Sequence, residues 1–112
     1  MFSERGIHGS IEDLLFPIHH GMLFYAGAEV LSPVLIMGSD RYTADDAELA
    51  LAQLRERLDT LQSAAPLPFR TQNGGDYENF TLRPGLSPGE TGLGMHRTQR
   101  VASPRCTDDY CA

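Results

Sequence analysis

A short loop near the N-terminus holds the residue best suited to chemistry. His8 lies between two glycines in the segment Gly6-Ile7-His8-Gly9. Histidine can change its charge near neutral pH, so an imidazole can donate a hydrogen bond, carry a proton or offset negative charge. The two glycines permit positive φ angles and a close approach of other atoms to the backbone. From spacing alone, however, the simpler interpretation is a loop histidine that bonds to nearby backbone.

The other potential metal ligands do not form a convincing set. His19 and His20 are adjacent in a predicted helix, where neighbouring side chains point about 100° apart and rarely share one ion. We interpret them as a polar flank of that helix or as a dimer contact. Cys106 and Cys111 are expected to be free thiols, because His96 is the only further candidate ligand near them. We therefore expect no metal site.

The loop leads into a predicted helix over residues 11–25. Ser10 is expected to cap this helix, and two acidic residues in its first turn add favourable negative charge. Pro17 removes a backbone donor and is expected to kink the helix or divide it in two, and Gly27 is the expected stop. One face is apolar at helical spacing, formed by Ile11, Leu14, Leu15, Ile18, Met22 and Tyr25.

A strand and a second helix are predicted after this first helix. Residues 34–37 form an apolar run typical of a buried strand, and Pro33 places that strand at a sheet edge or beside a bulge. The second helix is predicted over residues 43–61 with Thr43 as its cap. Its apolar stripe, which we interpret as core packing, consists of Ala47, Leu51, Leu54, Leu58 and Leu61. Helix, strand and helix make half of an α/β repeat, and one strand alone cannot form a parallel sheet.

Composition limits the classes of function. The chain has 112 residues, enough for one small domain, and a net charge of −6, which argues against a general nucleic-acid binder. Its N-terminus has no basic region followed by an apolar run, and its longest apolar-rich stretch is too polar for a membrane span. A cytoplasmic protein is expected. Residues 1–84 are expected to form the ordered part, and residues 85–112 a disordered tail without hydrophobic periodicity.

Several segments together resemble the flavodoxin-like NAD(P)H:quinone reductases. They are Gly6-Ile7-His8-Gly9, Leu15-Phe16-Pro17-Ile18, Gly21-Met22-Leu23 and Gly27-Ala28-Glu29-Val30-Leu31-Ser32-Pro33. In that family a similar loop leads into a helix with an aromatic-Pro-Ile core, then a strand, then a last helix opening with Thr and acidic residues. The resemblance covers residues 1–84. It implies an α/β fold of flavodoxin-like, doubly wound type, present only as the helix–strand–helix of the C-terminal half.

The resemblance also implies an activity and a set of site residues. Members of the family are homodimers that hold FAD or FMN at the subunit interface and pass a hydride from NAD(P)H through the flavin to a quinone, a two-electron reduction. His8 matches the family's catalytic histidine. Phe2, Gly6 and Gly9 would line the flavin as cofactor-binding residues. Phe2 stands where the family has an active-site tyrosine, so the tyrosine hydroxyl is missing here. The family also makes a site contact from the start of its last helix, through an Arg in some members. That position falls near Glu48 and the contact is not reproduced.

Other interpretations remain open. The family's first strand and phosphate-binding loop have no counterpart in this sequence, and Met1 matches an internal position, so we expect an internal-start fragment, a mis-called start or a decayed copy. One alternative function is an ancillary flavodoxin-like subunit of a potassium efflux system. The other is an inactive remnant that acts only through dimerisation.

Overall fold

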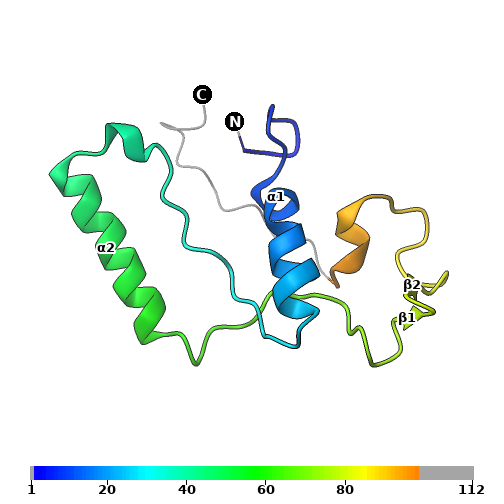
Figure 1. Cartoon of the computed structure of the whole chain (residues 1–112). Helices are drawn as coiled ribbons and strands as arrows, with labels where there is room; N and C mark the ends of the chain where they lie inside the picture. The colour runs from blue at the N-terminus through cyan, green and yellow to red at the C-terminus, as the bar shows by residue number, and fades with distance from the viewer. Residues whose placement is uncertain (1, 99–112) are drawn as a thin grey trace. The chain divides into compact units, whose positions relative to one another are not determined.

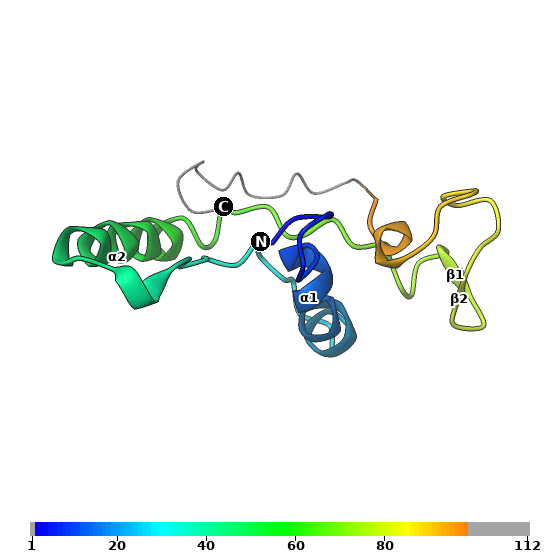
Figure 2. The same cartoon turned by 90° about the horizontal axis from the view of Figure 1, so that it is seen from above.

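The computed structural model describes residues 2–98, which divide into two compact units. The first unit comprises residues 2–30 together with residues 67–98, and the second comprises residues 31–66. Figure 1 marks the helix α1 (Ile11–Ile18) and the hairpin of β1 (Tyr77–Glu78) and β2 (Thr81–Leu82) in the first unit, and the helix α2 (Ala44–Asp59) in the second. In the first unit the short helix η3 (Leu93–His96) lies between α1 and the hairpin, as Figures 1 and 2 both show.

The first predicted helix forms in two parts with different hydrogen-bonding patterns. α1 runs over Ile11–Ile18, and a π-helix, η1, continues it over His19–Phe24. Ser10 caps α1 by accepting a hydrogen bond from the amide three residues on, at 3.1 Å. Pro17 lies inside α1 without ending it, and the change to the π pattern follows two residues later. The division expected at Pro17 is thus a change of hydrogen bonding and not a break.

After η1 the chain does not form the predicted strand. Gly27 ends the helical region as predicted, with a φ of +97°, and the Ala28 amide donates to the Leu23 carbonyl at 3.0 Å. The strand prediction for residues 34–37 is wrong, because this segment makes no strand hydrogen bonds and Ile36 is 48% exposed. A strand exists only by pairing with another strand, and no described segment pairs with this one.

The second unit contains a 3₁₀ turn, η2, over Ser39–Arg41 and the long helix α2 over Ala44–Asp59. Thr43 caps α2 as predicted. Its amide donates to Asp46 Oδ2 at 2.9 Å, while the Asp46 amide donates to Thr43 Oγ1 at 3.3 Å. The predicted core packing of the leucine stripe is not observed, because Leu58 is 59% exposed and Leu51 is 51% exposed. The helix therefore forms with its capping hydrogen bonds in place although its apolar face is not buried.

The remainder of the first unit is held by short elements. β1 (Tyr77–Glu78) and β2 (Thr81–Leu82) form an antiparallel pair, and η3 is a 3₁₀ helix over Leu93–His96. Phe69 and Arg97 form an isolated antiparallel bridge. The tail boundary expected at residue 85 is thus corrected for residues 85–98, which return to the first unit because their backbone finds hydrogen-bond partners there. Residues 99–112 of the expected tail lie outside the described residues.

Few side chains are buried. Val30 and Ser10 are the most buried of residues 2–98, each 7% exposed. Val30 belongs to the first unit, where its carbonyl accepts a hydrogen bond from the Leu67 amide at 2.7 Å. This bond joins the two sequence segments of the first unit. Large apolar side chains on α1 and η1, among them Leu14 and Met22, stay 49% and 64% exposed.

Candidate functional site

The loop before α1 brings the predicted site residues together. The Gly6 amide donates to the Ser3 carbonyl, and the Gly9 amide donates to the Gly6 carbonyl, both at 2.9 Å. These two successive turns fold the loop back on itself. The Phe2 ring stacks on the His8 ring as a result, with centroids 5.2 Å apart and planes 26° from parallel. His8 itself stays exposed to solvent.

Gly9 has a conformation that its residue type explains. Its φ is +72°, in the left-handed region that residues with a Cβ rarely adopt. A Cβ built at Gly9 would meet no atom within 4 Å, so the backbone angle and not crowding requires glycine here. Ser10 follows immediately as the α1 cap. The loop is therefore fixed to the helix at one end and presents His8 at its surface.

A cavity of about 890 Å³ lies beside this loop, within the first unit. Its size is in the range of small-molecule sites. Gly9 is the predicted site residue that lines it, whereas Phe2, Gly6 and His8 do not. Its walls carry more acidic than basic side chains and are formed by Ser3, Glu4, Arg5, Gly9, Ser10, Glu12, Asp13, Gly89, Glu90, Thr91, Gly92, Leu93, Gly94 and Arg97. Such a surface disfavours phosphate groups and accepts neutral or cationic ligands.

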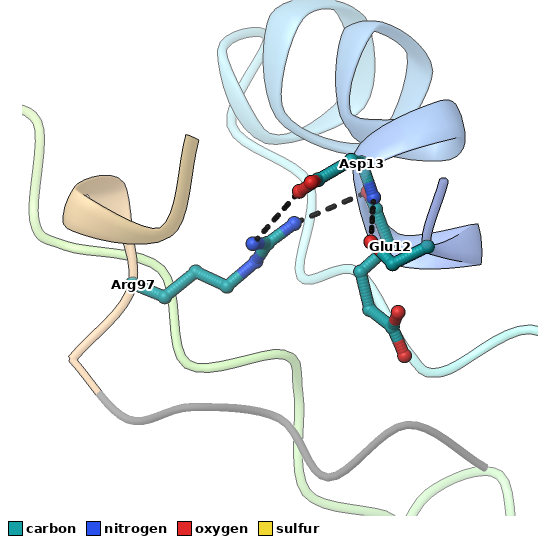
Figure 3. A network of polar contacts seen from close by, with 4 residues as sticks. Glu12, Asp13 and Arg97 are labelled. Carbon is teal, nitrogen blue, oxygen red and sulfur yellow. Dashed lines mark hydrogen bonds and ion pairs between the residues drawn. The ribbon is translucent and has the colours of Figure 1, made fainter. Parts of the chain in front are cut away.

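Arg97 ties the far wall of the cavity to the start of α1 (Figure 3). Its guanidinium donates to the Glu12 carbonyl at 3.1 Å and pairs with Asp13 Oδ1 at 3.5 Å. The same guanidinium lies over the Phe16 ring, 5.3 Å from the centroid. The Arg97 side chain is only 10% exposed, so this charge is held in place, and it still lowers the pKa of the nearby imidazoles. The residue next to it, His96, belongs to a cluster that the sequence did not reveal.

This aromatic cluster gathers six rings from four segments of the first unit: Phe16, His20, Phe24, Phe69, Tyr77 and His96. Phe16 and His20 stack with centroids 4.5 Å apart, and the two imidazoles lie 5.8 Å apart. The Tyr77 hydroxyl and His96 Nδ1 form a hydrogen bond of 2.8 Å. His20 Nε2 is buried and has no hydrogen-bond partner among the described residues. The expectation that His20 forms a polar flank is therefore wrong, because its ring packs against Phe69 and His96.

Both imidazoles of the cluster favour the neutral form. Burial lowers the pKa of His20 below its ordinary value, and the nearby His96 and Arg97 lower it further. Burial also lowers the pKa of His96, with additional contributions from Arg70 and Arg97. Burial raises the pKa of Tyr77. The hydroxyl therefore stays protonated and available to the His96 ring.

One signal in the sequence could have revealed part of the cluster. Phe16, His20 and Phe24 recur every four residues, a stripe on one side of the helix. Phe69 and His96 gave no such signal, because their contacts depend on how distant segments return. Within residues 2–98 no group of three or more potential metal ligands occurs. None of the described helices has the length and apolar character needed to cross a bilayer.

Comparison with known proteins places the chain among quinone oxidoreductases. A Ribosyldihydronicotinamide dehydrogenase-like protein traD from Penicillium crustosum is 42% identical over 103 residues, covering 89% of this chain and 38% of that protein. The NAD(P)H dehydrogenase (quinone) 1 of Cavia porcellus is 36% identical over 69 residues, covering 62% of this chain and 25% of that protein. No protein-family profile matches the chain.

A solved structure agrees with these relatives. A protein from Klebsiella pneumoniae, described as a candidate quinone reductase, is 52% identical to this chain and superposes with a TM-score of 0.80. The match covers 86% of this chain and 38% of that protein. The chain thus spans well under half the length of the relatives named here. The chain therefore belongs to the quinone oxidoreductase family.

Proposed function

We propose that the chain contributes the histidine loop of a flavin-dependent NAD(P)H:quinone oxidoreductase with a flavodoxin-like, doubly wound fold. The observation that carries the proposal is the stack of His8 on Phe2 in a glycine-flanked loop beside a ligand-sized cavity. The 52% identity to the candidate quinone reductase from Klebsiella pneumoniae supports it. The chain spans 38% of that protein, so the complete activity belongs to the whole fold.

The residues present fit the ring of a flavin better than its phosphates. Phe2 and His8 offer stacked, accessible rings, and Gly6 and Gly9 have no side chains to obstruct a flat ligand. The start of α1 is a poor phosphate site, because its own carboxylates compete for positive charge and Asp13 already pairs with Arg97. This chain would therefore hold the redox ring of FAD or FMN, while other parts of the fold hold the phosphates.

His8 has a defined role in this proposal. A bound flavin would supply the redox chemistry, which is two-electron hydride transfer from NAD(P)H to the quinone. Negative charge develops on oxygen during this reduction, and the His8 imidazole can stabilise it by donating a hydrogen bond or a proton. Phe2 stacks on His8 and restricts its orientation. Without a hydroxyl at position 2, His8 carries this electrostatic role without help from a tyrosine.

The cavity is consistent with a quinone. A quinone is flat and uncharged, so it avoids the repulsion that the acidic walls would impose on an anion. Arg97 is already engaged by Glu12 and Asp13 and offers little attraction to a phosphate. The exposed apolar side chains of η1, such as Met22 at 64%, would serve in a homodimer interface.

Flavin titration of the purified 112-residue chain tests the first part of the proposal. FMN and FAD are added while the quenching of flavin fluorescence is followed, with His8→Gln and the exposed-helix variant Glu56→Gln as matched samples. Saturable binding by the chain and by Glu56→Gln supports a flavin site built by these residues. Absence of binding by a folded chain would overturn the site for the isolated polypeptide and favour the remnant that acts only through dimerisation.

Activity is tested in the context of the whole fold. Residues 2–98 replace the matching segment of the Klebsiella pneumoniae protein, and NAD(P)H-dependent quinone reduction is measured with and without His8→Ala. We expect His8→Ala to lower kcat by about 10²-fold while flavin affinity changes much less. Equal losses of flavin affinity and turnover would contradict a chemical role for His8.

A further inference from the structure

Residues 93–98, which we call the latch, are fastened on one side to the segment 67–72. The Arg70 amide donates to the His96 carbonyl at 3.0 Å, and the Thr98 amide donates to the Pro68 carbonyl at 2.8 Å. Arg70 Nε also donates to the Met95 carbonyl at 2.7 Å. No histidine ring takes part in these contacts, so their loss reports release of the whole latch.

On the other side the latch depends on two imidazoles. The His96 ring lies 5.8 Å from the His20 ring and 5.9 Å from the Phe16 ring. Arg97 then reaches the start of α1. The contact between the latch and the helix thus places two titratable rings close together, with their planes tilted by 45°, and a guanidinium nearby.

The surroundings of the two rings are poor in negative charge. Among residues 2–98, the ionisable groups that surround the two rings or their immediate partners are Asp13, His19, Arg70, Asp76, Tyr77 and Arg97. Asp13 is paired with Arg97, and Asp76 accepts a hydrogen bond from the Thr71 amide at 3.0 Å. His20 Nε2 is buried without a partner, so a proton placed there would find no described acceptor. Protonating both rings would bring four positive charges into one small cluster.

We propose that the latch is a pH-sensitive device that stays closed on α1 and η1 while His20 and His96 are neutral, and opens when they take up protons. Repulsion among these rings, Arg70 and Arg97 would drive the opening. Tyr77 does not prevent it, because its hydroxyl can accept from a protonated Nδ1 as well as donate to a neutral one. The inference does not depend on the proposed activity.

The direction of the pH dependence follows from the lowered pKa values. The ordinary pKa of histidine is about 6.5, and in the closed latch both imidazoles lie below it. Above about pH 6.5 the rings are neutral in both the closed and the open form, and the latch has its full stability. As the pH falls below that value, the open form takes up protons first because its imidazoles have the higher pKa. The free energy of closure therefore becomes less favourable, and it stops changing once the pH lies below the lowered pKa values of the closed form. Each pH unit of difference shifts the equilibrium about tenfold per histidine.

Opening would also remove one wall of the cavity. Leu93, Gly94 and Arg97 belong both to the latch and to the cavity lining. Release of Arg97 from Asp13 and from the Glu12 carbonyl would separate that wall from the start of α1. The latch therefore couples proton uptake in the aromatic cluster to the shape of the cavity beside the His8 loop.

Amide hydrogen exchange of the full 112-residue chain, followed by NMR at about pH 7.5 and about pH 5 and corrected for intrinsic rates, tests the latch. The Arg70 and Thr98 amides report closure, and the Ala47 and Thr60 amides of the second unit serve as the internal control. We expect protection of the two latch amides to fall about tenfold or more while the control amides keep theirs. Unchanged latch protection, or equal loss at all four amides, would overturn the proposal.

Variants identify the groups that respond to pH. His20→Phe keeps an aromatic ring but cannot be charged, so the latch should lose less protection at low pH, and His20→Phe with His96→Phe should abolish the response. His19→Gln is the matched control from the same helix and should behave as the natural chain. If His19→Gln abolished the response, His20 and His96 would not be the trigger. If a variant fails to fold, the pH titration of the imidazole NMR signals in the natural chain provides the test. Titration midpoints at or above about pH 6.5 for both His20 and His96 would contradict the proposal.

Discussion

Single residues of the His8 loop carry both its shape and its proposed chemistry. Phe2 and His8 meet because two turns reverse the backbone between them, and Gly9 completes the reversal with a positive φ. The proposed role of His8 thus depends on a neighbour that performs no chemistry itself. A side chain at Gly9 would strain the backbone without touching anything.

The variant Gly9→Ala tests this dependence. A non-glycine residue in the left-handed region costs about 1–2 kcal/mol, so the start of α1 should open more readily. The measurement is amide exchange at Leu14, whose N–H donates to the Ser10 carbonyl at 3.1 Å. Gly21→Ala is the control, because Gly21 lies in η1 without a positive φ and has open space for a Cβ. Loss of protection by Gly21→Ala as large as by Gly9→Ala would refute the argument.

Tyr77 is the second residue for which the effect of a substitution on latch closure can be predicted. Its 2.8 Å hydrogen bond to His96 Nδ1 is partly buried, and such a bond contributes about 1 kcal/mol. Tyr77→Phe should therefore lower protection of the Thr98 amide by about fivefold at neutral pH. Tyr25→Phe serves as the comparison, because Tyr25 is 67% exposed. If the two variants had the same effect, the hydrogen bond would contribute nothing to closure.

Among the elements, α2 shows how local chemistry defines a helix. Thr43 and Asp46 form a reciprocal capping box, and the pKa of Asp46 is lowered by its hydrogen bonds to Thr43. The box satisfies amides that the first turn leaves unpaired. α2 forms from these signals although its leucines stay exposed.

Removing the cap should shorten α2. Thr43→Ala is expected to cost about 1 kcal/mol of helix stability, whereas Thr43→Ser keeps the hydroxyl and should cost much less. Exchange of the Ala47 amide, which donates to the Thr43 carbonyl at 3.1 Å, measures the effect together with helical circular dichroism. An equal response from the alanine and serine variants would show that the hydroxyl is not what begins this helix.

At the scale of the whole molecule, the chain has little buried apolar surface. Val30 is the buried hydrophobic residue among residues 2–98, and apolar burial is the main favourable term in folding. Cooperative unfolding requires many mutually dependent buried contacts. The exposed apolar stripe of α2 adds no buried contacts to the second unit.

The isolated chain should therefore unfold in urea over a broad range, without a sharp transition. The slope of the free energy of unfolding with denaturant should be small, because little surface becomes newly exposed. Circular dichroism of the chain and of the graft in the Klebsiella pneumoniae protein provides the comparison. A steep transition for the isolated chain, matching that of the graft, would mean that its apolar faces are covered in solution.

The sequence by itself determined the two longer helical segments, their caps and the family. Ser10, Thr43 and Gly27 act through hydrogen bonds to residues a few positions away, so their types and spacing were sufficient. The sequence motif of the His8 loop is likewise a short local segment, and the relatives confirm the family that it indicated. The roles of His8, Phe2, Gly6 and Gly9 stay predictions.

Only the tertiary structure decided how distant segments meet. Arg97 reaches Asp13, and His96 reaches His20, across more than seventy positions of sequence, and no periodicity encodes such contacts. The same reason explains the strand wrongly predicted at residues 34–37. A helix satisfies its hydrogen bonds within one segment, whereas a strand needs a partner that the segment itself cannot supply. The chain's local sequence thus fixed what forms alone, and its three-dimensional contacts fixed the cavity wall and the aromatic cluster.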